Sequence, residues 1–200
     1  MADTSKPLCL DLFCGRGGWA KGFLDAGYRV VGVDILDMRK YYPGEFIQAD
    51  IVGWHWTGER PRVIVASPPC TEFSQLAPVR EKVHGIKADP EKGLKLVAEA
   101  MRIIGELRPD HWALENVKGA KRYILRRPTA EIDAWVLWGT FPGFLREKSN
   151  KIWKTGFRPG KGYKKAHPSC HTSRMDHGPS YLRSITPYPI ARGLAEACLP

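Results

Sequence analysis

Near its start the chain reads Leu8-Cys9-Leu10-Asp11-Leu12-Phe13-Cys14-Gly15-Arg16-Gly17-Gly18, an apolar run that passes directly into a glycine-rich turn. The apolar run indicates a buried strand, and apolar residues at helical spacing follow from Trp19 to Ala26. Gly27 marks the end of that helix, and Arg29–Asp34 supplies a second buried strand with an acid at its tip. Residues 8–34 therefore predict a βαβ unit.

Further short apolar runs recur along the chain, separated by loops and by helical patterns. The predicted strands are Phe46–Ala49, Val63–Ala66, His111–Leu114 and Trp135–Trp138, and the predicted helices cover Pro90–Leu107 and Pro187–Cys198. Strands that alternate with helices predict an α/β fold with a Rossmann-like, doubly wound and mostly parallel sheet. Residues 146–183 are rich in Lys, Arg, Gly, Pro and His, which indicates a loop-rich basic region within one domain of residues 1–200.

Composition narrows the class of protein. A length of 200 residues with 43% hydrophobic side chains fits one globular domain with a core. The 31 Lys and Arg against 21 Asp and Glu leave a net charge of +10. This surplus favours a polyanionic partner such as nucleic acid, with a basic protein that binds no polyanion as an equal alternative.

Apolar runs and cysteines indicate the compartment. No stretch approaches the ~18 apolar residues of a membrane span, and the start, Met1 to Pro7, lacks the apolar run of a signal peptide. We therefore expect a cytoplasmic protein. The five cysteines are odd in number and scattered, which favours reduced thiols over disulfides.

The glycine turn after the first predicted strand lets the backbone approach a ligand closely. Asp34, about twenty residues later, is placed to bind the two hydroxyls of a ribose, so we expect a nucleoside-containing cofactor. The turn lacks the Gly-x-Gly-x-x-Gly of dinucleotide enzymes, which favours S-adenosylmethionine; a dinucleotide and a purely structural turn are the alternatives. Asp50, after the third predicted strand, is a candidate acceptor for an adenine amino group, or an exposed loop acid.

A cysteine and a glutamate follow neighbouring predicted strands. Cys70 comes after Ser67-Pro68-Pro69, where prolines fix the backbone at the carboxyl end of a strand, and Glu115 follows the next strand beside Asn116. A thiolate is suited to add to carbon 6 of cytosine, which activates carbon 5, and a protonated acid stabilises the charge on nitrogen 3. We expect burial to raise the pKa of this acid. For each residue by itself there is a structural alternative: Cys70 as a buried structural cysteine, and Glu115 as an exposed glutamate.

These motifs, in order along nearly the whole chain, resemble those of the DNA cytosine-5 methyltransferase family. Asp11–Gly18 is similar to the first cofactor motif, Pro68–Cys70 with Phe73 and Ser74 to the catalytic motif, Glu115–Val117 to the acid motif, and Ser184–Pro187 to the last motif. The resemblance implies a class I methyltransferase fold, a flipped cytosine in DNA, and a covalent adduct at Cys70. S-Adenosylhomocysteine would be the cofactor product.

The resemblance also assigns site residues. It implies catalytic roles for Cys70, Glu115, Pro69 and Asn116. It implies cofactor contacts at Asp11, Phe13, Cys14, Gly15, Gly17, Gly18, Trp19, Asp34, Ile35, Asp50, Ile51, Pro68, Ser184 and Thr186.

The stretch Thr71–Asp89 resembles the family's mobile catalytic loop. Expected DNA contacts are Ser74, Arg80, Lys82 and Lys87 in that loop, and Arg146, Lys148, Lys161, Lys164 and Lys165 in the basic region. The family's Gln-x-Arg-x-Arg element has no clean counterpart, and only Lys151–Arg183 stands in place of a full target-recognition region. This pattern is similar to that of small phage-encoded members of the family. We expect a monomer that recognises a short DNA sequence, needs a partner for recognition, or has little sequence selectivity.

The sequence raises three further questions: a metal site, an RNA substrate and a role without catalysis. His167, Cys170, His171 and His177 match no standard zinc pattern, so no metal is expected. An RNA (transfer RNA) cytosine-5 methyltransferase is an alternative, although the Cys-Phe-Thr sequence associated with that branch is absent. A non-catalytic DNA-binding accessory subunit with the same fold is the second alternative to a DNA methyltransferase.

Overall fold

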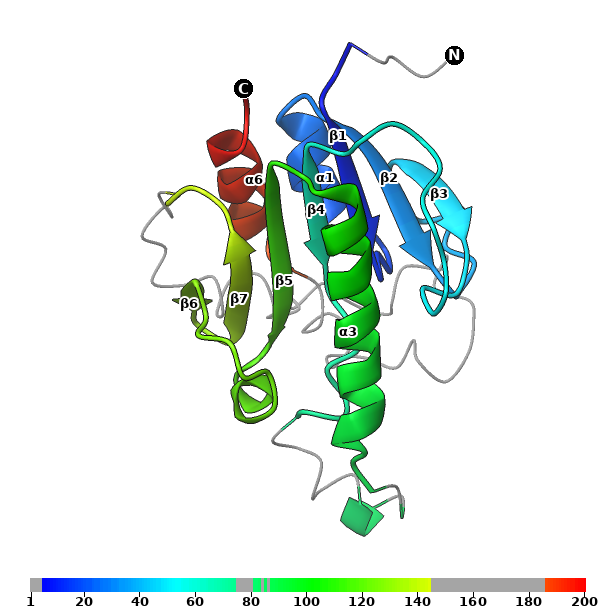
Figure 1. Ribbon diagram of the computed structural model, residues 1–200, viewed down its shortest axis with the longest axis vertical. Helices are drawn as coiled ribbons and strands as arrows, with labels where there is room; N and C mark the ends of the chain where they lie inside the picture. Colours follow the sequence, from blue (N-terminus) through cyan, green and yellow to red (C-terminus); the bar gives the residue numbers. More distant parts are fainter. Residues whose placement is uncertain (1–4, 75–80, 84, 86, 145–185) are drawn as a thin grey trace, which may run out of the picture.

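A computed structural model describes residues 5–74, 81–83, 85, 87–144 and 186–200 of the chain, and its centre is one twisted sheet (Figure 1). The strands are β1 (Leu8–Leu12), β2 (Arg29–Asp34), β3 (Glu45–Gln48), β4 (Val63–Ala66), β5 (His111–Val117), β6 (Ala130–Ile132) and β7 (Trp135–Thr140). They lie side by side in the order β3-β2-β1-β4-β5-β7-β6.

Strand direction identifies the fold class. The first five strands run parallel, whereas β7 pairs antiparallel with both β5 and β6. A parallel sheet of this order with an antiparallel β7 is the sheet of class I S-adenosylmethionine-dependent methyltransferases, and it confirms the predicted doubly wound, mostly parallel architecture.

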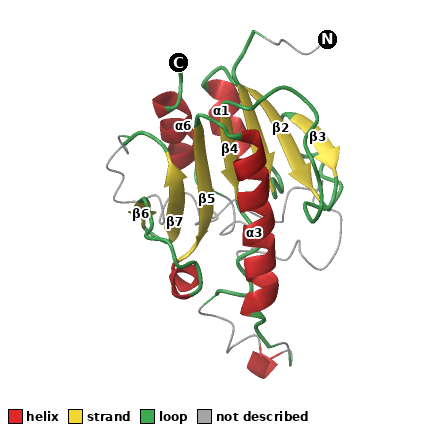
Figure 2. Cartoon of the chain, viewed as in Figure 1, coloured by secondary structure: helices red, strands yellow, loops and turns green. Residues whose placement is uncertain are grey.

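Helices cover both faces of the sheet (Figure 2). The helices are α1 (Gly18–Asp25), α3 (Pro90–Leu107), α6 (Tyr188–Ala197) and the short 3-10 helix η1 (Lys118–Arg122). The α3 helix packs on one face, and α1 and α6 pack together on the other. Strand side chains alternate between the faces, so Leu10 and Leu12 join the core under α3, while Cys9 joins the core with α1 and α6.

Several element bounds differ from the sequence prediction. The α1 and β3 elements begin one residue earlier than predicted, and neither β6 nor η1 was predicted. The main difference is β5, which runs three residues beyond Leu114 because β7 pairs with Glu115, Asn116 and Val117. Glu115 therefore lies within a strand instead of after one.

Of the five cysteines, Cys9, Cys14, Cys70 and Cys198 are free thiols, as predicted for them. Cys170 and the basic region of residues 146–183 lie outside the described residues. Within the described part of the chain, none of the helices is long and apolar enough to cross a membrane.

Candidate active site

The parallel strands all end at the lower edge of the sheet in Figure 1, and the predicted site segments meet there. The glycine turn follows β1, Asp34 ends β2, Asp50 follows β3, and Cys70 follows β4. Because parallel strands present their carboxyl ends at one edge, segments far apart in sequence are gathered into one site.

The glycine turn is held in a conformation that glycine favours. Gly15 has φ 48° and Gly17 has φ 81°, both in the left-handed region, and Phe13 shares that region with φ 57°. A Cβ atom added at Gly15 would meet no other atom within 4 Å, so the backbone of the turn is open on that side. Gly17 caps α1, and Gly18 begins the helix.

Asp34 ties the turn to the tip of β2. Its Oδ2 accepts a hydrogen bond from Gly15 N at 2.9 Å, and its Oδ1 accepts one from Leu36 N at 2.9 Å. Each carboxylate oxygen has a second lone pair, so the hydroxyls of a ribose still have acceptors here.

Asp11 lies beneath the turn and is 1% exposed. Tyr42 donates its hydroxyl hydrogen to Oδ2 at 3.0 Å, whereas Oδ1 has no hydrogen-bond partner among the described residues. Burial, with a smaller contribution from the charge of Asp34, raises the pKa of Asp11 to about 8 although the Tyr42 bond lowers it. A buried carboxyl with an unpaired oxygen suits a cationic ligand.

Apolar surface is exposed beside Asp34 and Asp50. Ile35 is 60% exposed and Val52 is 38% exposed, and Asp50 Oδ1 accepts a hydrogen bond from Val52 N at 3.0 Å. Exposed aliphatic side chains next to hydrogen-bonding acids suit a flat heterocycle such as adenine. Ile51 is 2% exposed and packs in the core under α3, so the exposed apolar side chain of this turn is Val52.

Two other predicted cofactor contacts have buried side chains. Cys14 packs next to Gly32, where a Cβ atom would lie 2.7 Å from its Sγ, and Trp19 packs in the core. The Cys14 thiol lies 3.8 Å from Gly15 O in the glycine turn, and the indole nitrogen of Trp19 donates to Ser67 Oγ at 2.9 Å. Thr186 is buried just before α6, and Ser184 lies outside the described residues.

Asn116 fixes the backbone that leads to Cys70. It is fully buried, its Nδ2 donates to Pro68 O at 3.0 Å, and its Oδ1 accepts from Val117 N at 2.9 Å. After Cys70 the chain turns back, with Phe73 N donating to Cys70 O at 3.0 Å. Both ends of the Asn116 side chain are thus bonded to backbone, and its predicted catalytic role stays a prediction. Pro68 is buried and Pro69 is exposed.

Glu115 points to the opposite sheet face from Asn116, since neighbouring strand residues alternate. The β4–β5 register ends with Ala66 opposite Leu114, which brings Ser67 beside Glu115. Glu115 is 7% exposed, and its burial raises its pKa to about 7 against the lowering effect of a hydrogen bond with Ser67. This is the direction that the sequence predicted.

Cys70 and Glu115 interact electrostatically. Burial raises the pKa of the Cys70 thiol to about 11, and the charge of Glu115 contributes to the rise. An ionised Glu115 therefore makes ionisation of the Cys70 thiol less favourable.

Sequence reasoning missed two residues that organise this site. Ser67 links Trp19 and Glu115, and Tyr42 holds Asp11. Ser67 adjoins the Pro68-Pro69-Cys70 motif, which was a usable indication. Tyr42 lies 31 residues from Asp11, and no local pattern connects the two.

The predicted DNA contacts are only partly within the described residues. Ser74 is half-buried, Lys82 is exposed, and exposed Lys87 lies 4.0 Å from Glu81. Arg80, Arg146, Lys148, Lys161, Lys164 and Lys165 lie outside the described residues, as do His167, Cys170, His171 and His177.

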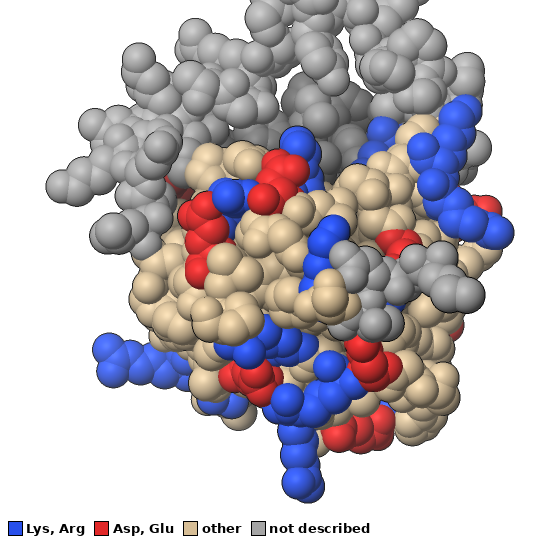
Figure 3. All heavy atoms as spheres, turned by 90° about the horizontal axis from the view of Figure 1, so that it is seen from above, with Lys and Arg blue, Asp and Glu red and all other residues tan. Residues whose placement is uncertain are grey.

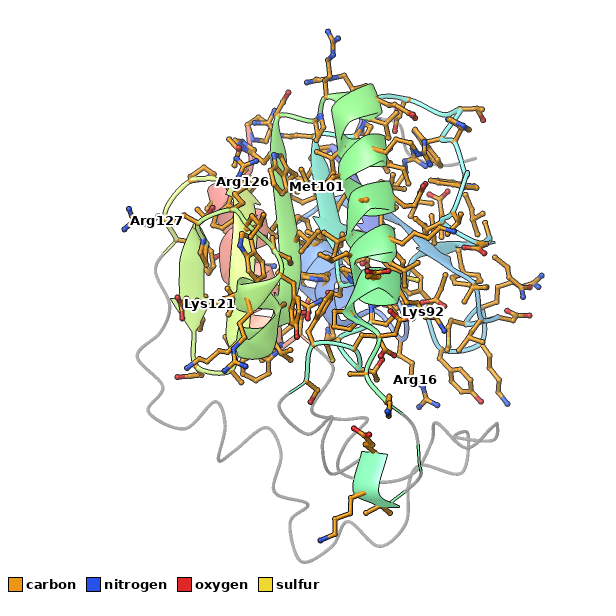
Figure 4. All side chains as sticks on the ribbon, turned by 60° about the horizontal axis from the view of Figure 1, so that its bottom comes forward. Arg16, Lys92, Met101, Lys121, Arg126 and Arg127 are labelled. Carbon is orange, nitrogen blue, oxygen red and sulfur yellow. The ribbon has the colours of Figure 1, made fainter. Side chains whose placement is uncertain are left out.

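An apolar groove of about 300 Å³ lies elsewhere, between α3 and the segment that follows η1. In Figure 4, Met101 of α3 and Arg126 stand at the level of this groove, and the Arg126 guanidinium lies 5.1 Å from the centre of the Trp112 ring. None of the residues that line the groove comes from the site around Cys70.

Comparison with known proteins agrees with this geometry. The sequence profile described as "C-5 cytosine-specific DNA methylase" matches residues 8–127, which include the glycine turn, Cys70 and Glu115. The chain belongs to the C-5 cytosine-specific DNA methylase family. It is 33% identical over 170 residues to the "Probable DNA (cytosine-5)-methyltransferase" of Frog virus 3, covering 75% of this chain and 72% of that protein.

Other relatives of this methylase family are longer than the chain. It is 30% identical over 141 residues to the "Type II methyltransferase M.AplI" of Arthrospira platensis, a match that spans 64% of the chain but 37% of that protein. Among solved structures, the Dnmt2 methyltransferase of S. pombe is 14% identical with a TM-score of 0.42, covering 60% of this chain and 36% of that chain.

Proposed function

We propose that this chain transfers a methyl group from S-adenosylmethionine to carbon 5 of cytosine in DNA, through a covalent adduct at Cys70. The observation that carries the proposal is the placement of a thiol and a carboxyl on adjacent strands: Cys70 follows β4, and Glu115 is buried within β5. Family membership supports the same reaction.

The residues around the glycine turn fit S-adenosylmethionine, which supplies an electrophilic methyl group on a positively charged sulfur. Asp34 would accept the ribose hydroxyls, Asp50 would accept from the adenine amino group, and Ile35 would cover one face of the ring. The carboxyl of Asp11, with its unpaired oxygen, would favour the positive charge of the cofactor.

Cys70 and Glu115 then activate the base. Cys70 Sγ forms a bond to carbon 6 while Glu115 donates its proton to nitrogen 3, so the electron pair of the 5,6 double bond reaches carbon 5. Carbon 5 takes the methyl group, and S-adenosylhomocysteine leaves. Loss of the carbon 5 proton to a base, cleavage of the sulfur–carbon 6 bond and return of the nitrogen 3 proton to Glu115 complete the cycle.

One proton transfer prepares both groups. With a pKa of about 11 for Cys70 and about 7 for Glu115, the thiol is the weaker acid of the pair. Moving the thiol proton to the Glu115 carboxylate produces the nucleophile and the acid together, and this transfer costs free energy in the free site. Binding of the base beside the pair is the event that has to offset this cost.

DNA is the proposed substrate because of the family and the net charge of +10. The target cytosine would be flipped into the site, since carbon 5 and carbon 6 are not accessible to Cys70 in a stacked duplex. The proposal also includes a short target-recognition region, as in small phage members of the family, and a role for a partner in recognition.

A mechanism-based trap tests the proposal. Duplex DNA carrying 5-fluorocytosine, mixed with the protein and S-adenosylmethionine, should give a covalent complex that survives denaturation, because fluorine cannot leave as a proton does. Cys70→Ala should give none, while Cys198→Ala, which removes a different buried thiol, should still trap. Native protein that neither traps nor methylates duplex DNA would favour the non-catalytic alternative, and methylation of transfer RNA alone would favour the RNA enzyme.

A further inference from the structure

Three cations follow directly after the acid of the site. The η1 helix starts where β5 ends, and its Lys118, Lys121 and Arg122 are all exposed. Lys121 Nζ forms an ion pair with Glu131 Oε1 at 2.5 Å, and Figure 4 shows Lys121 on the β6 side of η1. Lys118 and Arg122 have no acidic partner among the described residues.

The η1 helix is fixed to the segment that carries Cys70. Tyr123, the residue after η1, packs on Phe73 with ring centroids 5.5 Å apart. Phe73 is hydrogen-bonded to Cys70 through its backbone and packs against Gly93 of α3, where an added Cβ would lie 2.6 Å from the ring. The cations of η1 and the nucleophile therefore belong to one packed unit.

At the opposite edge of the sheet, two cations are paired with an acid. Arg60 and Arg62 contact the two oxygens of Asp110 at 2.7 and 3.0 Å. Figure 3, which views the molecule from that end, shows basic and acidic side chains intermingled. Lys118 and Arg122 differ from Arg60 and Arg62, because their charges are left for an anionic ligand close to the site.

We propose that Lys118 and Arg122 bind the backbone phosphates that flank the flipped cytosine. Lys118 is three residues from Glu115, and three residues span at most about 11 Å, whereas phosphates on one strand recur about every 3.4 Å along the duplex axis. A base held at Glu115 therefore brings its neighbouring phosphates within reach of η1. The inference rests on DNA being the substrate, and it adds a contact surface outside the catalytic loop and the basic region.

The test compares two variants with the same change in charge. Lys118→Gln/Arg122→Gln removes the η1 cations, and Arg60→Gln/Arg108→Gln removes two cations at the opposite edge. Binding to a cytosine-containing duplex is measured from 50 to 200 mM salt, together with single-turnover methylation at saturating DNA.

Loss of two phosphate contacts should lower the slope of log K against log salt by about 1.8, so the variant loses about ten-fold less affinity than the native protein over this range. Affinity at low salt should also fall in the η1 variant. The control should keep the native slope.

Two results overturn the inference: a native slope in the η1 variant, or an equal loss in the control. If native protein methylates DNA and the slope is unchanged, the contact surface is wrong and the proposed function stands. If the slope falls as predicted but native protein methylates no cytosine, the proposed reaction is wrong and the DNA surface stands.

Discussion

At the scale of single residues, the chemistry depends on where one proton lies. Glu115 is buried on the α1 side of the sheet and Cys70 follows β4, so each ionised group raises the cost of ionising the other. The productive pair, a thiolate with a protonated acid, carries the same number of protons as the resting thiol and carboxylate. Activity should therefore depend on the total number of protons that Cys70 and Glu115 hold together, and be highest when they hold one.

The pH profile of kcat/KM, measured with S-adenosylmethionine saturating because Asp11 also titrates near pH 8, reports that count. Below about pH 7 both groups hold protons, so kcat/KM should rise with pH through about 7 and then stay level toward the pKa of Cys70, about 11. Glu115→Gln should remove the rise and lower kcat by roughly 10²–10⁴. A rate that falls as pH passes 7 would show that the two groups do not share a proton in this way.

At the scale of elements, the helix pair α1 and α6 sets the layer behind the glycine turn. The two helices touch at Gly22, where an added Cβ would lie 2.5 Å from Arg192 N and 2.6 Å from Ala191 C. Backbone atoms cannot move aside as a side chain can, so only glycine permits this approach. The segment that leads into α6 contains the buried Thr186, one of the predicted cofactor contacts.

Gly22→Ala should destabilise the protein by about 1–3 kcal/mol, because α6 has to shift away from α1. Thermal unfolding should show a fall of several degrees in Tm, at about 2–4 °C per kcal/mol for a protein of this size. Gly105→Ala on α3 is the matched control, since its added Cβ meets nothing within 4 Å. That substitution should leave Tm unchanged or raise it, and equal losses in both variants would contradict the close-contact explanation.

At the scale of the whole molecule, the parallel strands collect the proposed cofactor and base sites at one edge (Figure 1). The glycine turn, Asp34, Cys70 and Glu115 come from β1, β2, β4 and β5 in sequence order. A ligand that bridges these strand ends should stabilise the fold as a unit, because it binds only the folded state.

S-Adenosylmethionine at about 100 times its Kd should stabilise the chain by about 2.7 kcal/mol, seen as an increase in Tm. Asp34→Ala should reduce the increase, since Asp34 would bind the ribose and holds Gly15 N at 2.9 Å. Asp37→Ala is the matched control, because Asp37 is exposed and, within the described part of the chain, its side chain bonds only to Arg39. An unchanged increase in the Asp34 variant would remove Asp34 from the proposed cofactor site.

Most of the fold could be predicted because its strands are short, apolar and bounded by turns. The β1, β2 and β4 bounds were predicted within one residue, since their apolar runs stop at Gly, Asp or Ser-Pro. β6 was missed because three residues with one apolar position have no readable period. The extension of β5 through Val117 was missed because it depends on pairing with β7, twenty residues away.

By itself the sequence determined the βαβ start, the strand to which each motif is attached, and the order of the predicted cofactor and catalytic segments. These follow from the spacing of apolar residues and the positions of glycine and proline, which are local properties. Tertiary structure alone decided that Glu115 faces Ser67 while Asn116 holds Pro68, that Tyr42 meets Asp11, and that η1 packs beside Cys70 through Phe73. These contacts join residues that are distant along the chain, and the free energy of burial and pairing that fixes them exists only once the sheet has formed.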